Sequence, residues 1–243
     1  MKRSLILALN TTTMQYGLAL LREAGSVVAE EIREGRDRRF GGLMPVLGRM
    51  LEESRASLQS LKAVAVATGP GSFTGLRVGL SAAKGLCHGL GIPLIGISSL
   101  EALAHQVPFS PGPVCALVDS RRGEFFVARF RHTENGRLQR TTDDECLGAD
   151  DLRDRAWEPA VWIGNDYSKQ APILEQALDG TALLAPPQMW HIRASSVGAL
   201  AMERLRKGDT DDLGTLKPLY HRPPDIRPNP YPLRGGFEKR QGR

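Results

Sequence analysis

Residues 68–84 read TGPGSFTGLRVGLSAAK, which is the most unusual stretch of this 243-residue chain. A β-rich run at residues 63–67 precedes it, and Ser72 is a candidate N-cap for a helix that extends to about His88. Glycine permits the left-handed backbone that a sharp turn from strand to helix needs. The motif predicts either a phosphate cradle at the helix N-terminus or a tight turn with close packing. It is neither a Walker A loop, since no Gly-Lys-Ser/Thr follows, nor a GxGxxG fingerprint.

The helix within this stretch carries a stripe with almost no side chains. Gly75, Gly79 and Ala83 recur at intervals of four residues, with Ala82 beside them. Such a face lets another backbone approach closely, as it does in membrane helices. The approaching backbone belongs either to the chain's own sheet or to a second chain, and the sequence favours neither. In the second case, Gly79→Leu is expected to leave the lobe folded and to abolish the contact between chains.

Hydrophobic patterning around the motif predicts an α/β first half. Apolar residues recur at helical spacing over residues 43–54, which predicts an amphipathic helix. A strand at 92–97 and a helix from Ser98 or Ser99 to Gln106 follow the motif. Before them, short apolar runs joined by tight turns indicate an antiparallel meander of three strands. These strands are expected at residues 4–9, 16–21 and 27–32.

The second half repeats this order less distinctly, so the sequence predicts two related α/β lobes. Proline and glycine residues between 107 and 113 break any helix and mark the boundary. The first lobe is expected to span residues 1–107 and the second residues 113–220. Asn10 and Asp119 end the first strand of each lobe. Strands of the second lobe are expected at residues 113–119, 124–131, 137–142, 161–163 and 181–184, and helices at 168–178 and 195–206.

Composition and charge indicate a globular protein with a distinct C-terminal tail. Hydrophobic residues make up 41% and charged residues 24%, which excludes collagen-like, wholly disordered and disulfide-scaffold classes. The net charge is +5, but residues 221–243 hold six basic and two acidic residues, so residues 1–220 carry only +1. This tail also has five prolines and is expected to be disordered. We interpret it as a solvated terminus, with a weak RNA-contacting arm as the alternative.

The sequence indicates neither a membrane segment nor a disulfide framework. No apolar run approaches the roughly 20 residues that span a bilayer. The apolar stretch at residues 5–9 is shorter than the core of a signal peptide. Cys87, Cys115 and Cys146 are far apart and form no CxxC pair. We therefore expect a cytoplasmic protein.

Several segments along the chain carry a family resemblance. They are LILALNTT at residues 5–12, the motif at 69–84, PLIGISSLEALA at 93–104, VDSRRGEFF at 118–126, WIGN at 162–165 and PLY at 218–220. In this order, over most of residues 4–220, they resemble the TsaB family, also called YeaZ. The resemblance implies an actin-like, two-lobe fold of the ribonuclease H type, which agrees with the predicted order of elements.

The resemblance also implies a role beside a catalytic relative. TsaB is the bacterial partner of TsaD in making threonylcarbamoyladenosine on tRNA, at the adenosine beside the anticodon. TsaD holds a metal with an H-x-x-x-H pair, and the matching positions here are Ser99 and Leu103, which cannot replace imidazoles. Actin-like ATPases end their first strand with Asp, but this chain has Asn10, which lacks the charge that a divalent cation favours. The resemblance thus implies no cofactor bound by this chain, with ATP and metal at partner subunits.

The remaining polar residues indicate no further site. No HExxH motif is present. All five histidines are interpreted as packed or solvated, and Asp119 as ion-paired with Arg121 and Arg122. The acidic pairs at residues 143–144 and 211–212 are expected in solvated loops.

Two functions follow from these observations. The first is a non-catalytic subunit of the threonylcarbamoyladenosine modification complex, which docks through first-lobe helices and activates TsaD. It implies a heterodimer with TsaD, a TsaE-type ATPase in the complex, indirect contact with tRNA, no membrane, and a homodimer as an option for the isolated chain. The alternative is a stand-alone actin-like ATPase or metallopeptidase, which the missing metal ligands disfavour. The expected partner interface comprises Leu43, Leu47, Met50, Gly75, Leu76, Gly79, Ala82 and Ala83.

Overall fold

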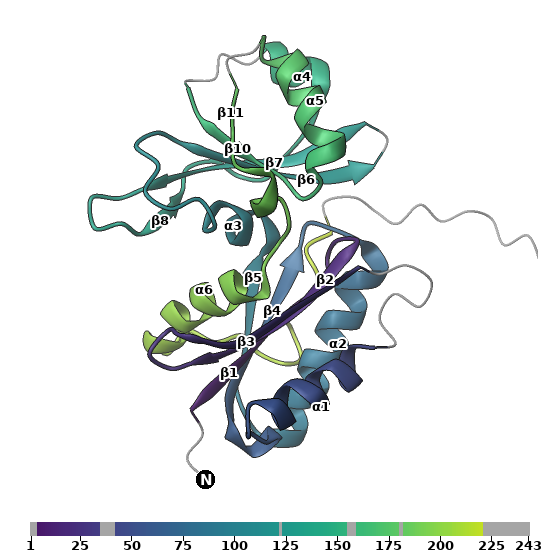
Figure 1. Ribbon diagram of the computed structural model, residues 1–243, viewed down its shortest axis with the longest axis vertical. Coiled ribbons are helices and arrows are strands. Elements are labelled where there is room, and N and C mark those ends of the chain that lie inside the picture. The colour runs from purple at the N-terminus through teal and green to yellow at the C-terminus, as the bar shows by residue number, and fades with distance from the viewer. Residues whose placement is uncertain (1–3, 35–41, 122, 155–158, 180–181, 221–243) are drawn as a thin grey trace, which may run out of the picture.

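The computed structural model consists of two mixed β-sheets with helices packed on both (Figure 1). The structure describes residues 4–34, 42–121, 123–154, 159–179 and 182–220. The basic tail at residues 221–243 lies outside these ranges, so its disorder stays a prediction. Within the described ranges, no helix is long and apolar enough to cross a membrane.

The first sheet has the strand order β3-β2-β1-β4-β5. β1 pairs antiparallel with β2 and parallel with β4, while β3 is antiparallel to β2 and β5 parallel to β4. The predicted meander and the two later strands are therefore confirmed. The strands are β1 (Leu5–Asn10), β2 (Gln15–Arg22), β3 (Val27–Glu34), β4 (Leu61–Gly69) and β5 (Leu94–Ser98).

Side chains of this sheet alternate between two hydrophobic layers, as the two-residue period of a strand requires. Leu7 and Leu9 of β1 pack in the layer beneath the helices α1 (Leu43–Glu53) and α2 (Phe73–Leu90). Ile6 and Ala8 belong to the other layer, which extends into the second lobe. Because both faces are covered, β1 is apolar throughout rather than alternating. A short 3-10 turn, η1 (Leu58–Ser60), precedes β4.

The second sheet repeats the first in order and direction. Its order is β11-β10-β6-β7-β8, with β6 antiparallel to β7 and parallel to β10. An extra strand, β9, also pairs with β7, and it was not predicted because residues 143–154 contain few apolar side chains. The helix α4 was not predicted for the same reason. The elements are β6 (Val114–Arg121), β7 (Glu124–His132), β8 (Leu138–Arg140), β9 (Glu145–Gly148), α4 (Ala149–Asp154), β10 (Val161–Ile163), α5 (Tyr167–Ala177), β11 (Leu183–Leu184) and η2 (Pro187–Met189).

The last helix of each half lies between the two sheets rather than on the outside (Figure 1). α3 (Ser99–Ala104) packs mainly on β6 of the second sheet, whereas α6 (Ala194–Arg206) packs on β1 and β2 of the first. The boundaries 1–107 and 113–220 therefore separate the strands of the two lobes but not their helices. Buried residues of α3, α6 and both inner sheet faces form one continuous hydrophobic cluster. This cluster ties the lobes together.

The glycine-rich motif forms a tight turn pressed against the end of β1. Ser72 caps α2, because its side chain accepts a hydrogen bond from the Gly75 backbone, and its own amide donates to the Thr12 carbonyl at 2.6 Å. A Cβ atom at Gly71 would lie 2.4 Å from that carbonyl oxygen. The N-cap prediction is confirmed, and close packing explains the glycine.

Candidate functional site

The stripe of small residues on α2 faces the chain's own first strand. Thr11 Oγ1 donates a 2.7 Å hydrogen bond to the Gly75 carbonyl. A Cβ atom at Gly79 would lie only 2.2 Å from the same hydroxyl oxygen, and Ala83 is fully buried. The stripe thus serves packing within the lobe. The expectation that Gly75, Gly79 and Ala83 form a contact surface for another chain is corrected accordingly.

The apolar residues expected at the partner interface also lie in the core. Leu43, Leu47 and Met50 of α1 are at most 3% exposed, and Leu76 of α2 is 2% exposed. These side chains point inward because the apolar side of an amphipathic helix covers its own sheet. Of the eight residues named from the sequence, only Ala82 is partly exposed.

The outward side of the same two helices carries small residues that the sequence analysis missed. Gly48 of α1 and Gly85 and Gly89 of α2 are exposed, and no atom of the described residues lies within 4 Å of the Cβ position of any of them. Ser81 and Ala82 border them on α2, and Met44 of α1 is 44% exposed. We call this surface the α1–α2 face, defined by Met44, Gly48, Ser81, Ala82, Gly85 and Gly89. The signal was present in the sequence as a second spacing of four residues, from 81 to 85 to 89.

Asn10, at the position of the ATPase aspartate, is a buried structural residue. Its Nδ2 atom donates to the Ile192 carbonyl at 2.8 Å, which joins β1 to the segment before α6. Its Oδ1 atom accepts hydrogen bonds from the backbone amide and the hydroxyl of Thr12. Every polar atom of this side chain is therefore occupied within the protein, and only 1% of the residue is exposed.

Ser99 and Leu103, which the resemblance aligns with the histidine pair of TsaD, are equally enclosed. Ser99 is fully buried, and its hydroxyl donates to Thr12 Oγ1 at 3.2 Å. Leu103 is fully buried in the layer between the lobes. In the part of the chain that the structure describes, no three histidine, cysteine or carboxylate groups are arranged to hold a metal ion.

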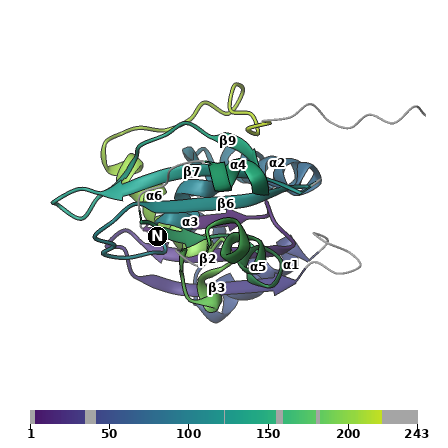
Figure 2. The same ribbon diagram turned by 90° about the horizontal axis from the view of Figure 1, so that it is seen from above.

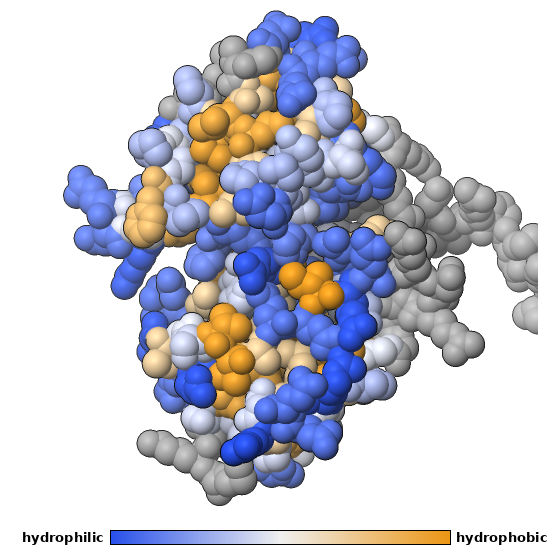
Figure 3. All heavy atoms as spheres, viewed as in Figure 1, coloured by the Kyte–Doolittle hydropathy of each residue, from blue (hydrophilic) through white to orange (hydrophobic). Residues whose placement is uncertain are grey.

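A cleft of about 790 Å³ opens between the lobes, where β1, β6 and β10 end. Among the described residues, the carboxylates of Glu34, Asp119 and Asp166 line it together with Lys169, which pairs with Asp166 at 2.9 Å. Burial and nearby Arg193 lower the pKa of His191, so its ring adds no charge at neutral pH. The described part of the cleft lining is thus rich in carboxylates. On the face drawn in Figure 3, the band between the lobes is mostly hydrophilic.

A second cavity, of about 370 Å³, brings together two histidines that are isolated in the sequence. His105 follows α3 and His132 ends β7, and both line this cavity with Glu101 and Glu203. Burial lowers the pKa of His105, while nearby Glu203 opposes that shift. Burial also raises the pKa of Glu101. Sequence spacing carries no signal for this group, because the lobes must close before its members meet.

The acidic pairs differ from the expected solvated loops. Asp144 forms an ion pair with Arg140 and is largely buried. Asp211 pairs with Arg204 at 3.0 Å and also accepts a 2.8 Å hydrogen bond from the Gly96 amide. The expectation is wrong for these two residues, because each carboxylate forms an ion pair with an arginine side chain. Asp119 is exposed, and its expected partners, the Arg121 and Arg122 side chains, lie outside the described atoms.

Comparison with known proteins settles the family. The family model of TsaD, tRNA N6-adenosine threonylcarbamoyltransferase, matches residues 41–201. The tRNA threonylcarbamoyladenosine biosynthesis protein TsaB of Bacillus subtilis is 30% identical over 220 residues, covering 89% of this chain and 93% of the relative. The Escherichia coli protein of the same name is 38% identical over 231 residues, covering 89% and 94%. The chain belongs to the TsaB family.

Solved structures carry the same fold as this TsaB-family chain. YeaZ from Pseudomonas aeruginosa superposes with a TM-score of 0.75 at 22% identity, over 89% of this chain and 99% of the other. Together with the repeated sheet order, this likeness confirms the predicted fold of two related α/β lobes. The Geobacillus kaustophilus tRNA N6-adenosine threonylcarbamoyltransferase is 27% identical over 206 residues, but the match spans only 58% of that protein. The chain thus matches TsaB proteins along nearly their whole length and the transferase along little more than half.

Proposed function

We propose that this chain is the TsaB subunit of the tRNA threonylcarbamoyladenosine modification complex and acts on TsaD through its α1–α2 face. The names of its relatives place the family in threonylcarbamoyladenosine biosynthesis. The match to the TsaD family model shows that the chain is related to TsaD, and the resemblance to the TsaB family supports TsaD as the partner. A TsaE-type ATPase in the complex remains an expectation from the resemblance, and a cytoplasmic location remains a prediction from the sequence.

One observation carries this proposal: three exposed glycines lie inside the helices of the α1–α2 face. A glycine inside an exposed helix costs about 1 kcal/mol relative to alanine. At Gly48, Gly85 and Gly89, no described atom of the lobe is close enough to require a residue without a side chain. A helix of another molecule could pack closely against these glycines, because small residues let two helix backbones approach each other.

The site chemistry supports a non-catalytic role. Acyl and phosphoryl transfer need positive charge or a metal placed at the reacting atoms. At the position that matches the metal site of TsaD, this chain offers Ser99 and Leu103, both engaged in its own core. Among the described residues, the interlobe cleft is lined by three carboxylates and by one lysine, which is paired with Asp166. The alternative of a stand-alone ATPase or metallopeptidase lacks comparable support.

Substitutions of Gly85 test the docking surface. Gly85→Trp is expected to weaken binding to TsaD by about a hundredfold, because a bulky ring at a close helix contact overpacks it by about 1–3 kcal/mol. Gly85→Ala adds one methyl group and is expected to have a small effect. Gln176→Trp, on the exposed side of α5, is the matched control and is expected to bind like the wild type. Isothermal titration with purified TsaD gives the dissociation constants.

A second measurement distinguishes TsaD from a second copy of this chain as the partner. Sedimentation of the chain alone shows whether Gly85→Trp also dissolves a homodimer. Unchanged TsaD affinity in a well-folded Gly85→Trp variant would contradict docking through the α1–α2 face.

A further inference from the structure

The cavity of about 370 Å³ that holds His105 and His132 lies where a hairpin of the second lobe meets the inner helices. We call it the hairpin cavity, because the turn between β7 and β8 supplies one wall, while α3 and the C-terminal half of α6 supply others. Figure 2 shows α3 and α6 between the two sheets. The hairpin projects on the same side of the molecule as α6 in both Figure 1 and Figure 2.

Two carboxylates line the hairpin cavity without a partner. Glu101 belongs to α3 and is partly buried, and Glu203 belongs to α6. Burial raises the pKa of Glu101, and the negative charge of Glu203 adds to that rise. In the described ranges, neither carboxylate accepts a hydrogen bond or forms an ion pair. The two acidic groups therefore repel each other and leave their oxygen atoms available.

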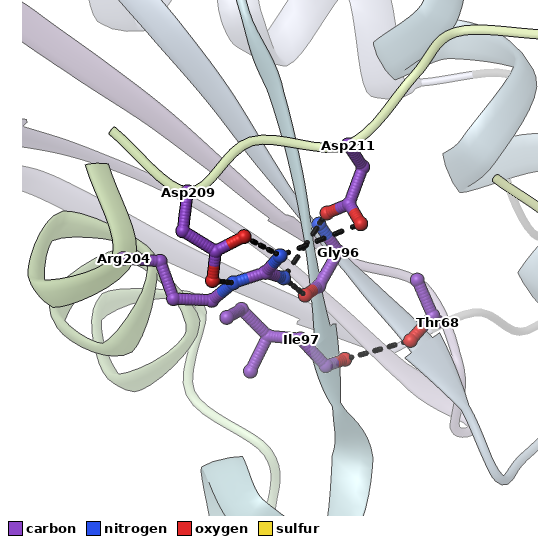
Figure 4. Close-up of polar contacts among 6 residues, drawn as sticks. All are labelled: Thr68, Gly96, Ile97, Arg204, Asp209 and Asp211. Carbon is purple, nitrogen blue, oxygen red and sulfur yellow. Dashed lines mark hydrogen bonds and ion pairs between the residues drawn. The ribbon is translucent and has the colours of Figure 1, made fainter. Parts of the chain in front are cut away.

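The arginines near Glu101 are already paired within the protein. The positive charges of Arg140 and Arg204 offset part of the rise in the pKa of Glu101. Arg140, however, forms an ion pair with Asp144, and Arg204 forms ion pairs with two aspartates (Figure 4). A partly buried carboxylate that accepts no hydrogen bond is unfavourable. The cavity thus favours a cationic group that can donate hydrogen bonds to Glu101.

Two imidazole nitrogens beside these carboxylates are also unsatisfied. The Nδ1 atoms of His105 and His132 are buried, and neither has a hydrogen-bond partner among the atoms that the structure describes. Buried polar atoms in native proteins nearly always bind a partner, so this pair indicates a ligand with hydrogen-bonding groups. Since no three metal-binding groups of the described chain are arranged to hold an ion, an organic cation fits better than a metal.

The rim of the hairpin cavity carries the opposite charge. Arg137 on the hairpin and Lys207 after α6 are exposed, and in the part of the chain that is described neither forms an ion pair. Both side chains suit a carboxylate, and an arginine can bind its two oxygens at once. Apolar side chains complete the described lining, namely Ile97, Leu138 and Leu200.

We infer that the hairpin cavity binds a small α-amino acid with an aliphatic side chain. The ammonium group of the ligand binds Glu101 and Glu203, its carboxylate binds Arg137 or Lys207, and its side chain contacts the apolar wall. This class of ligand fits because the described lining combines unpaired acidic groups, unpaired basic groups and apolar surface around one small volume. An amine without a carboxylate would leave the rim unpaired, and a carboxylic acid without an ammonium group would leave Glu101 unpaired.

Titration of the full-length chain with L-leucine tests this inference. The imidazole resonances of His105 and His132, followed by NMR, are expected to shift with a dissociation constant of about 1 mM or tighter. Two analogues of leucine probe the charged ends separately. Isopentylamine lacks the carboxylate and isocaproate lacks the ammonium group, and each is expected to bind at least about tenfold more weakly, because a polar group of the site is left unpaired.

Substitutions at the two ends of the cavity assign the contacts. Glu101→Gln is expected to weaken leucine binding by about tenfold or more, and Arg137→Gln by about threefold to tenfold, because an exposed ion pair contributes less. Arg137→Gln should leave isopentylamine binding unchanged. Glu175→Gln on α5 and Arg153→Gln on α4 each remove one exposed charge and should bind leucine like the wild type. Thermal melting checks that all four variants are folded.

Each contrary result bears on a stated part of the inference. Absence of leucine binding up to about 10 mM would overturn it. Unchanged leucine affinity in folded Glu101→Gln and Arg137→Gln variants would also overturn it, since the ligand would then bind elsewhere. Isopentylamine that bound as tightly as leucine would disprove the carboxylate contact and with it the amino acid. The titration uses this chain alone, so its outcome does not depend on association with TsaD.

Discussion

Gly79→Leu is expected to destabilise the first lobe strongly. The new side chain would occupy space held by the Thr11 hydroxyl, which lies 2.2 Å from the Cβ position, and would disturb its hydrogen bond to Gly75. Overpacking together with a lost buried hydrogen bond costs about 3 kcal/mol or more. For a chain of this size, the melting temperature should fall by about 6–12 °C. Calorimetry or thermal circular dichroism measures the shift.

Gly85→Leu on the same helix is the matched control. In the described part of the chain nothing lies within 4 Å of its Cβ position, and leucine has a higher helix propensity than glycine. This variant should melt at or above the wild-type temperature, although it alters the α1–α2 face. If Gly79→Leu melted like the wild type, the internal packing of the stripe would be disproved.

Asn10→Asp is expected to lower stability without creating an ATPase. The substitution restores the carboxylate found in actin-like ATPases, but at this site it removes the Nδ2 donor to Ile192. A charged oxygen would then face a carbonyl oxygen in a buried place, at a cost of about 2–4 kcal/mol. Urea unfolding measures the loss, and phosphate release from ATP should stay at the background rate.

Acidification should restore part of the stability that the Asn10→Asp variant loses. Burial and the facing carbonyl raise the pKa of the introduced carboxyl, so the folded variant binds its proton more tightly than the unfolded chain does. Stability relative to the wild type therefore rises as the pH falls toward that pKa, because the protonated carboxyl again donates to Ile192. Asn135→Asp, on the exposed β7–β8 hairpin, should show neither effect. Metal-dependent ATP hydrolysis by Asn10→Asp would contradict the structural role of this residue.

The elements were predictable from the sequence wherever hydrophobic periodicity is strong. β1 is apolar on both faces, α1 has one apolar side, and Ser72 supplies a cap before α2. The exchange of α3 and α6 between the lobes was not predictable. Each helix is apolar enough to cover either sheet, and the choice depends on how the two finished sheets face each other. The strand β9 was missed because it pairs at the edge of β7 with little apolar surface.

The candidate site was predictable only in part. The sequence directed attention to α1 and α2, but two stripes of small residues share α2. One contains Gly75 and Gly79, the other Ser81 and Gly85, and composition alone gives no reason to turn either toward the sheet. The position of Thr11 determines which stripe faces the sheet, because its hydroxyl donates a hydrogen bond to Gly75 of the first stripe. The contact between the rings of Phe73 and Tyr220 was equally hidden, since the two residues are separated by 147 positions in the chain.

Formation of threonylcarbamoyladenosine on tRNA by purified proteins tests the central claim most directly. With TsaD and the full set of partner proteins, the wild-type chain is expected to support modification, and Gly85→Trp to reduce it more than tenfold. Asn10→Ala, assayed where it remains folded, should retain nearly full activity, and omission of TsaD should abolish the product. Modified tRNA formed by this chain without TsaD, or inactivity of a folded Asn10→Ala variant that binds TsaD, would contradict the account.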